Sequence, residues 1–133
     1  MRAGIGNPII VNCIFWANTE TPATSVTSAQ IFVQSAVINA TYSCIQDSVA
    51  GDGSIPFGGA TAHNIDLDPM FENAAGGNFT PGFGSPCIDT GSNAAVPAGI
   101  TTDLVGHPRI IDGDHNETAT VDIGALESPG IGS

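Results

Sequence analysis

The sequence predicts a small all-β fold, and three observations favour it. The 133 residues include 17 Gly and 9 Pro but no Lys, and only 11% are charged, which favours turns and short strands over helices. Short runs of β-branched and aromatic residues alternate with turn-forming stretches. Two of these runs share a Cys-Ile pair, 31 positions apart. A chain of this length is expected to form one domain around one core.

The predicted strands lie in the first 50 residues. Residues 9–16 are β-branched and aromatic, with Asn-Pro before them and Ala-Asn after them, which is typical of a strand. Residues 17–29 are mostly Thr, Ser, Ala and Pro without periodicity, and we expect a loop. Residues 30–34 predict a second strand, and residues 36–45 predict a third strand or two short ones.

The spacing of Cys13-Ile14 and Cys44-Ile45 suggests a repeat of the length found in solenoids. A solenoid rung, built of short strands and turns, must stack on a neighbour to bury its apolar face. After residue 50 the chain changes to Gly, Pro, Asp and Asn with short apolar islands. We therefore predict β-helix rungs in residues 1–50 and an irregular capping segment in residues 51–133, packed on the same core as a single domain.

Six short motifs occur in a characteristic order over almost the whole chain. They are NCIFWAN at 12–18, YSCIQ at 42–46, NIDLDPMF at 64–71, SPCIDTG at 85–91, TDLVGHPR at 102–109 and VDIGALE at 121–127. Together they resemble the C-terminal end of bacterial right-handed parallel β-helix surface proteins, pectate-lyase-like and of the choice-of-anchor Q type. The resemblance implies a last rung or two followed by a cap, in proteins that are mostly secreted or surface-attached, and it implies no active site.

This chain departs from that family because the long run of N-terminal rungs is missing. The first rung is then expected to expose unpaired strand groups, and self-association is the natural way to satisfy them. We therefore expect a homo-oligomer.

The charge balance excludes several kinds of partner. Arg2 and Arg109 face 13 acidic residues, for a formal net charge of -11, so no basic patch for nucleic acid or anionic membranes can form. The N-terminal apolar run, residues 9–11, is too short for a signal-peptide core or a membrane span. We expect no membrane insertion, and the sequence leaves the cellular compartment unassigned.

The three cysteines, Cys13, Cys44 and Cys87, include no CxxC pair and no His at ligand spacing. We interpret them as buried free thiols that act as small apolar side chains.

Catalytic chemistry has few candidates. Asp66 and Asp68 would lie on the same side of an extended segment, as a glycosidase pair requires, but Asp-Leu-Asp-Pro is equally good turn chemistry. Arg109 could clamp an acidic sugar, although an ion pair with one of the acids is the simpler interpretation. A polyuronate would also be repelled by so acidic a surface.

Calcium is the cofactor that the sequence suggests best. Residues 112–118 place oxygen ligands at alternate positions, like the first half of an EF-hand loop, and the candidate ligands are Asp112, Asp114, Asn116 and Asp122. The match is incomplete, because Glu117 occupies the Gly position and Ile123 replaces the final bidentate Glu. An acidic surface turn without a metal is the alternative.

The leading functional prediction is a non-catalytic structural module that assembles with copies of itself or with a surface partner. The alternative is a carbohydrate-binding or carbohydrate-active module, with Trp16 and Tyr42 as stacking platforms for a polysaccharide. Both aromatic residues lie in predicted strands, so packing in the core competes with that role.

Overall fold

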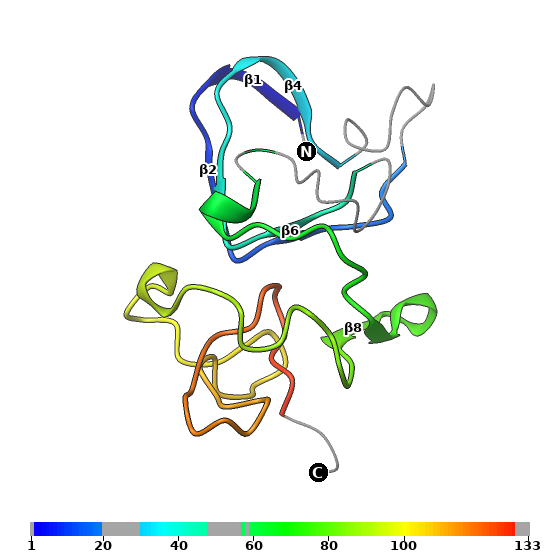
Figure 1. Cartoon of the computed structure of the whole chain (residues 1–133), viewed down its shortest axis with the longest axis vertical. Helices are drawn as coiled ribbons and strands as arrows, with labels where there is room; N and C mark the ends of the chain where they lie inside the picture. Colours follow the sequence, from blue (N-terminus) through cyan, green and yellow to red (C-terminus); the bar gives the residue numbers. More distant parts are fainter. Residues whose placement is uncertain (1, 20–29, 48–56, 58, 130–133) are drawn as a thin grey trace. The chain divides into compact units, whose positions relative to one another are not determined.

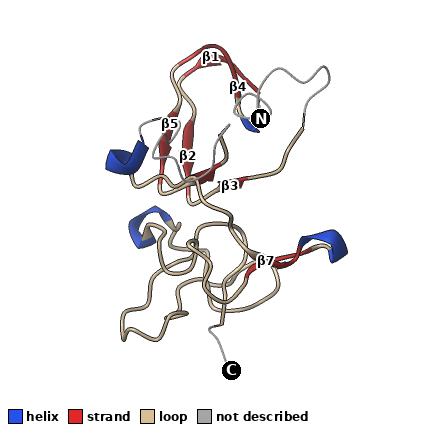
Figure 2. Cartoon of the chain, turned by 45° about the vertical axis from the view of Figure 1, so that its right-hand side comes forward, coloured by secondary structure: helices blue, strands red, loops and turns tan. Residues whose placement is uncertain are grey.

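The structure, a computed structural model, describes residues 2–19, 30–47, 57 and 59–129. Its regular elements are eight short strands and three 3₁₀ helices, which confirms the all-β class (Figure 2). The chain divides into two compact units, Met1–Asp68 and Pro69–Ser133. The predicted loop at 17–29 lies outside the described residues from residue 20 onward.

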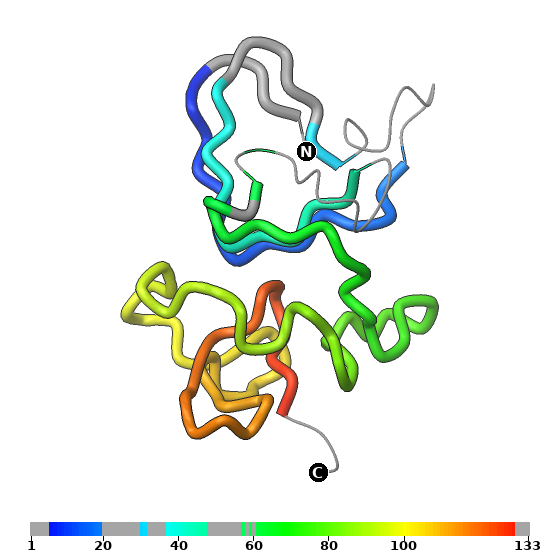
Figure 3. Tube along the Cα trace, in the orientation of Figure 1, coloured from blue at the N-terminus to red at the C-terminus, as the bar shows by residue number. Residues whose placement is uncertain are grey.

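The first unit contains three pairs of parallel strands (Figure 1). Strand β1 pairs with β4, β2 with β5, and β3 with β6; their bounds are Arg2–Gly6, Ile9–Val11, Ile14–Phe15, Phe32–Ala36, Asn39–Thr41 and Cys44–Ile45. Every pair has the same offset, because each residue lies opposite the one 30 positions later. Residues 2–19 and 30–47 are therefore two layers, paired strand by strand. Figure 3 shows residues 6–19 and 37–47 running side by side.

A third layer follows the second. Its 3₁₀ helix η1, Gly59–Ala62, leads to Ile65, which forms a parallel bridge with Cys44 of β6. The N–H of Ile65 donates to the carbonyl of Ser43 at 2.8 Å, and the N–H of Ile45 donates to the carbonyl of Ile65 at 2.9 Å. Strand β6 thus lies between β3 and the third layer.

The strands are shorter than predicted because the chain turns a corner in every layer. Asn12 and Tyr42 occupy the same position in successive layers, and both have left-handed backbone angles, with φ of 54° and 48°. His63, which precedes the third layer's bridge, has φ of 60°. This conformation cannot continue a strand, so the predicted strand at 9–16 is in fact β2 and β3, and the run at 36–45 contains β5 and β6.

The repeat length inferred from the cysteines is wrong by one residue. The structure places Ile14, not Cys13, opposite Cys44, so the repeat is 30 residues rather than 31. Cys13 instead lies beside Ser43, whose Oγ accepts the N–H of Cys13 at 3.3 Å. The side chains of Cys13 and Ser43 each donate to the carbonyl two residues earlier, so the two residues make the same local hydrogen bond at the corner of their layers.

An apolar core lies inside these layers. Its buried members are Ile10, Ile31, Ala40 and Ile45, with Cys13, Phe15, Ile38 and Phe57 packed against them. The register explains part of this set, since Ile10 and Ala40 are direct partners and point the same way. All three cysteines are free thiols, and Cys44 and Cys87 are completely buried, whereas Cys13 is partly exposed.

Asn64 joins the layers at the polar corner. Its Oδ1 accepts the N–H of Ser43 at 3.1 Å, and its Nδ2 donates to the carbonyls of Ala40 and Phe57 at 2.8 and 3.1 Å. The residue is only 1% exposed, so these bonds satisfy groups that water does not reach.

The second unit begins with an antiparallel hairpin inside the segment predicted to be irregular. Strands β7, Phe71–Asn73, and β8, Asn78–Pro81, are joined by the 3₁₀ helix η2, Ala74–Gly76. Gly77 ends η2 with φ of 85°, where a side chain would be strained. The rings of Phe71 and Phe79 meet edge to face at 5.2 Å. Beyond the hairpin, the described part of this unit has the 3₁₀ helix η3, Asn93–Ala95, and the isolated bridges Thr102–Pro108 and Ile111–Thr120.

Among the residues that the structure describes, no helix combines the length and the hydropathy that crossing a membrane requires.

Candidate functional site

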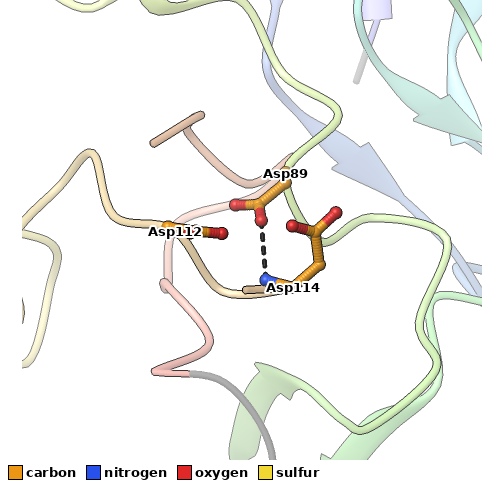
Figure 4. A group of neighbouring side chains, drawn as sticks. All are labelled: Asp89, Asp112 and Asp114. Carbon is orange, nitrogen blue, oxygen red and sulfur yellow. Dashed lines mark hydrogen bonds between the residues drawn. The ribbon is translucent and has the colours of Figure 1, made fainter. Parts of the chain in front are cut away.

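Three aspartates of the second unit bring their carboxylates together. One oxygen from each of Asp89, Asp112 and Asp114 lies within 4.8 Å of the other two. Figure 4 shows Asp89 between the other two side chains, with its carboxylate bonded to the backbone of Asp114. Asp89 and Asp112 are partly buried, and Asp114 is exposed.

Hydrogen bonds from the chain assemble this group. Asp89 accepts the N–H of Gly113 at 3.2 Å and the N–H of Asp114 at 2.7 Å, one on each oxygen. The oxygens of Asp112 and Asp114 accept donors from Asn116 and Glu117 in the next turn. All six oxygens of the group therefore have a hydrogen-bond partner.

The pKa values of the two partly buried aspartates, Asp89 and Asp112, are shifted in opposite directions. Burial raises the pKa of Asp89, and the adjacent Asp114 charge adds to that effect against two backbone hydrogen bonds. Desolvation acts to raise the pKa of Asp112. The hydrogen bonds donated by the N–H groups of Glu117 and Asn116 outweigh this effect, so the pKa is lowered. Three oxygen ligands at this spacing could hold a hard divalent cation such as calcium.

The predicted calcium ligands are only partly brought together. Asp112 and Asp114 belong to the group, and Asn116 lies beside them through its backbone and side-chain nitrogens. Asp122 lies outside the group, and the structure supplies Asp89 in its place. Asp89 is 23 positions before Asp112, so no local spacing pointed to it.

A second, buried cluster surrounds Arg109. Its guanidinium contacts the carboxylate of Glu127 and donates to the carbonyl of Gly124 at 2.8 Å. Both oxygens of Glu127 accept the N–H of Asp122. Asp122 in turn accepts the N–H of Asp89 at 2.8 Å and the N–H of Ser128 at 2.6 Å. The ion-pair interpretation of Arg109 is therefore confirmed, and its partner is Glu127.

Burial dominates the protonation of the two acids in this cluster. Asp122 and Glu127 are both completely buried. Desolvation raises the pKa of Asp122 to about 6, against two backbone hydrogen bonds. Desolvation and the Asp122 charge raise the pKa of Glu127 to about 8, against Arg109.

Asp103 organises the loop that carries Arg109. Its Oδ1 accepts the N–H groups of Val105 and His107, both at 2.9 Å, and its Oδ2 accepts the N–H of Glu127 at 2.9 Å. The His107 ring approaches Oδ2 at 3.3 Å. Burial acts to raise the pKa of Asp103, but the three N–H donors prevail and lower it. Sequence reasoning assigned no role to Asp103, Asp89 or Glu127, although all three lie in the motifs that carry the family resemblance.

The two aspartates considered for glycoside hydrolysis lie in different environments. Asp66 is 3% exposed and accepts the N–H of Asp47 at 3.3 Å, whereas Asp68 is exposed. A general acid and a nucleophile must both face the substrate. One buried and one exposed carboxylate do not form such a pair.

The predicted aromatic platforms are only partly accessible. Trp16 and Tyr42 are both half-buried. The ring of Tyr42 stacks on that of exposed His63, with centroids 4.5 Å apart and planes 14° from parallel. Sequence reasoning missed this partner, because 21 positions separate the two residues and only the layered path brings their corners together.

Comparison with protein-family models, with curated proteins and with solved structures gave no match.

Proposed function

We propose that this chain is a non-catalytic structural module. In this proposal its first unit is the terminal part of a right-handed parallel β-helix, the remainder is the capping segment, and the module self-associates through the free strand edge. The observation that carries the proposal is the common 30-residue offset of three parallel strand pairs. Parallel strands related by a constant offset are what successive turns of a solenoid produce.

The contacts between layers support the same interpretation. The side chains of Ser43 and Asn64 each accept a backbone N–H of the layer before them. Such polar corner contacts repeat from layer to layer and fix the stacking register. The ring of Tyr42 in the second layer also stacks on the ring of His63 in the third layer.

The first layer supplies the edge for self-association. Among the described strands, β1, β2 and β3 each have one neighbour, so the opposite edge of the first layer has no partner within the described chain. Edge strands are normally guarded by charges or proline. Residues 1–19 contain no acidic residue, although the whole chain carries a net charge of -11. A second copy therefore meets no acidic residue on this layer.

The acids and the arginine considered for catalysis also support a structural role. Arg109 is engaged by Glu127 and Gly124, and Asp66 is buried against Asp47. These contacts hold the backbone and leave neither side chain directed at a substrate.

The test is the molar mass of the full chain by light scattering over a range of concentrations, for wild type and two variants. Ile9→Asp adds a charge to the first layer at a side chain that is 76% exposed, and Val37→Asp adds the same charge to the second layer at one that is 69% exposed. We expect wild type and Val37→Asp to be dimers or trimers and Ile9→Asp to dissociate. A monomeric wild type, or two variants that behave alike, would contradict the proposal.

Carbohydrate binding is the second candidate, and the Tyr42–His63 ring pair is the observation that favours it. Aromatic faces at a surface are common stacking platforms for sugar rings. A panel of neutral and acidic polysaccharides tests it, scored for retention and for release of reducing ends. Retention lost in Tyr42→Ala but kept in Phe79→Ala establishes a binding module, and release establishes an enzyme.

Calcium at Asp89, Asp112 and Asp114 is the cofactor proposal, supported by the approach of the three carboxylates. Bound calcium stabilises the folded state by mass action, so the melting temperature should be higher in millimolar calcium than in chelator. Equal melting temperatures would end this proposal.

A further inference from the structure

The sequence contains three Asn-X-Thr tripeptides, at residues 39–41, 78–80 and 116–118. Such a tripeptide accepts an N-linked glycan when it lies in a surface loop of an exported protein. A transferase must reach two groups of the tripeptide at once, the asparagine carboxamide that it modifies and the threonine hydroxyl that it recognises. The folded surroundings of the three tripeptides therefore decide which of them can be modified.

Two of the three tripeptides lie in paired strands. Residues 39–41 are strand β5 itself, which pairs in parallel with β2, and the middle residue Ala40 is buried. Residues 78–80 begin β8 of the hairpin, where Phe79 packs edge to face on Phe71 and Thr80 is only 9% exposed. A transferase could enclose either tripeptide only by separating the strands.

The third tripeptide lies in an exposed turn. Every residue from 114 to 119 is exposed. His115 and Glu117 have left-handed backbone angles, with φ of 62° and 72°, so the chain turns on both sides of Asn116. Asn116 and Thr118 are thus both open to a large partner, which neither of the strand-bound tripeptides is.

Hydrogen bonds fix the carboxamide of Asn116 in one orientation. Its Oδ1 accepts the N–H of Thr118 at 2.9 Å, and its Nδ2 donates one hydrogen to Oδ2 of Asp114 at 3.0 Å. A side chain that is already ordered loses less conformational entropy when a partner binds it. The exposed turn therefore presents the asparagine and the threonine together in a defined conformation.

The comparison with Asn78 shows which feature separates the sites. Its Oδ1 accepts the N–H of Thr80 at 3.1 Å, and its Nδ2 donates to Glu72 at 3.0 Å, so its carboxamide makes the same two kinds of contact as that of Asn116. The two sites differ in the threonine, which is buried at position 80 and exposed at position 118. Asn78 is therefore a matched control within the same chain.

We propose that Asn116 is an N-glycan acceptor site of the folded chain and that Asn39 and Asn78 are not. In the transfer, Nδ2 of Asn116 forms a bond to the anomeric carbon of a sugar carried on a lipid pyrophosphate. The bond from that carbon to the pyrophosphate oxygen breaks, and its electron pair leaves with the lipid pyrophosphate. The proton lost from Nδ2 goes to a basic group of the transferase.

The test is transfer of a glycan to the purified, folded full chain in vitro. The probe is a single-subunit oligosaccharyltransferase that requires only Asn-X-Ser/Thr, supplied with its lipid-pyrophosphate-linked oligosaccharide. Mass spectrometry of peptides locates the glycan in wild type, Asn116→Gln and Asn78→Gln. We expect one glycan, at Asn116, in wild type and in Asn78→Gln, and loss of the modification in Asn116→Gln.

Thr118→Ala provides a further variant, because it removes the hydroxyl but keeps the N–H that Asn116 accepts. We expect it to lose the glycan as well. The location of the glycan in the wild-type chain is a result that holds even if a variant fails to fold. An unmodified Asn116 in a reaction that glycosylates a folded reference protein, or equal modification at Asn39 or Asn78, would overturn the proposal.

Discussion

At Asp103 a single carboxylate organises three backbone amides, and Asp89 and Asp122 each accept two. The second unit has little regular structure, so its backbone N–H groups need other acceptors. Short aspartate side chains supply them. This use of carboxylates explains how an irregular segment forms a defined fold.

Replacing Asp103 by Asn should destabilise the chain by about 1–3 kcal/mol at neutral pH. An amide accepts on one side only, so either the N–H of Glu127 or those of Val105 and His107 lose their acceptor. Urea unfolding measures the loss, and Asp68→Asn, at an exposed aspartate, is the control.

The same variant has a defined pH dependence. The folded-state pKa of Asp103 is below its ordinary value of 3.8, so its stabilisation is present above pH 3.8 and lost as the pH falls through the folded value. The difference in the free energy of unfolding between wild type and Asp103→Asn should therefore become smaller in strong acid. A gap that stays constant down to pH 2 would contradict the role assigned to this carboxylate.

Replacing Arg109 by Met should destabilise the folded chain by about 3–5 kcal/mol at pH 8, because it leaves the buried carboxylate of Glu127 without its counter-charge. Arg2→Met makes the same change of net charge at the other cation of the sequence. Denaturant unfolding of both variants measures the difference. Equal stabilities would show that Arg109 is not the partner on which the cluster depends.

The ion pair of Arg109 could be predicted from the sequence, but its partner could not. Only two cations face 13 acids, so pairing was expected from composition alone. In the sequence, Glu127 lies 18 positions after Arg109, and Asp103 lies 24 positions before Glu127. No helical or strand period connects such positions, and folding of the loops decides which acids meet.

At the scale of elements, the sequence located the strands well but not their lengths or register. The β-branched runs do contain β2, β3, β5 and β6. The corners at Asn12 and Tyr42 were missed because a left-handed angle is uncommon at a residue other than glycine. Strand β1, Arg2–Gly6, was missed because two of its five residues are glycine, which disfavours strands.

Asn64→Leu should cost roughly 2–4 kcal/mol, because it leaves the N–H of Ser43 and the carbonyls of Ala40 and Phe57 without their buried partner. Asn7→Leu makes the same substitution at an exposed asparagine of the same unit and serves as the reference. Thermal and urea unfolding give the two values. Little change in Asn64→Leu would mean that the polar corner does not hold the layers together.

At the scale of the whole molecule, the chain divides into two compact units after Asp68, whereas the sequence predicted a change from rungs to cap at residue 50. The division lies after Asp68, because residues 59–68 still belong to the layered path. This third layer is made of a 3₁₀ helix and a single bridging residue, so its sequence looks like the irregular segment that follows. Periodicity cannot identify a layer without a strand run.

Charge is also distributed unevenly over the molecule. All 13 acids follow residue 19, and the second unit uses several of them to bind its own backbone. Residues 21–46 also contain no acid, so acidic repulsion is absent from the first layer and from nearly all of the second. This distribution connects the layered path to the proposed self-association.

The most direct test of the account is the stacking register itself, measured by NMR couplings across hydrogen bonds in the labelled full chain. We predict couplings from the N–H of Cys44 to the carbonyl of Cys13, from Gln46 to Phe15, and from Ile65 to Ser43. These three bonds together require parallel layers with a 30-residue offset and a third layer above the second. Couplings that pair β3 with β6 in antiparallel order, or that run from Cys44 to Asn12 and from Gln46 to Ile14 as an offset of 31 residues requires, would contradict the account.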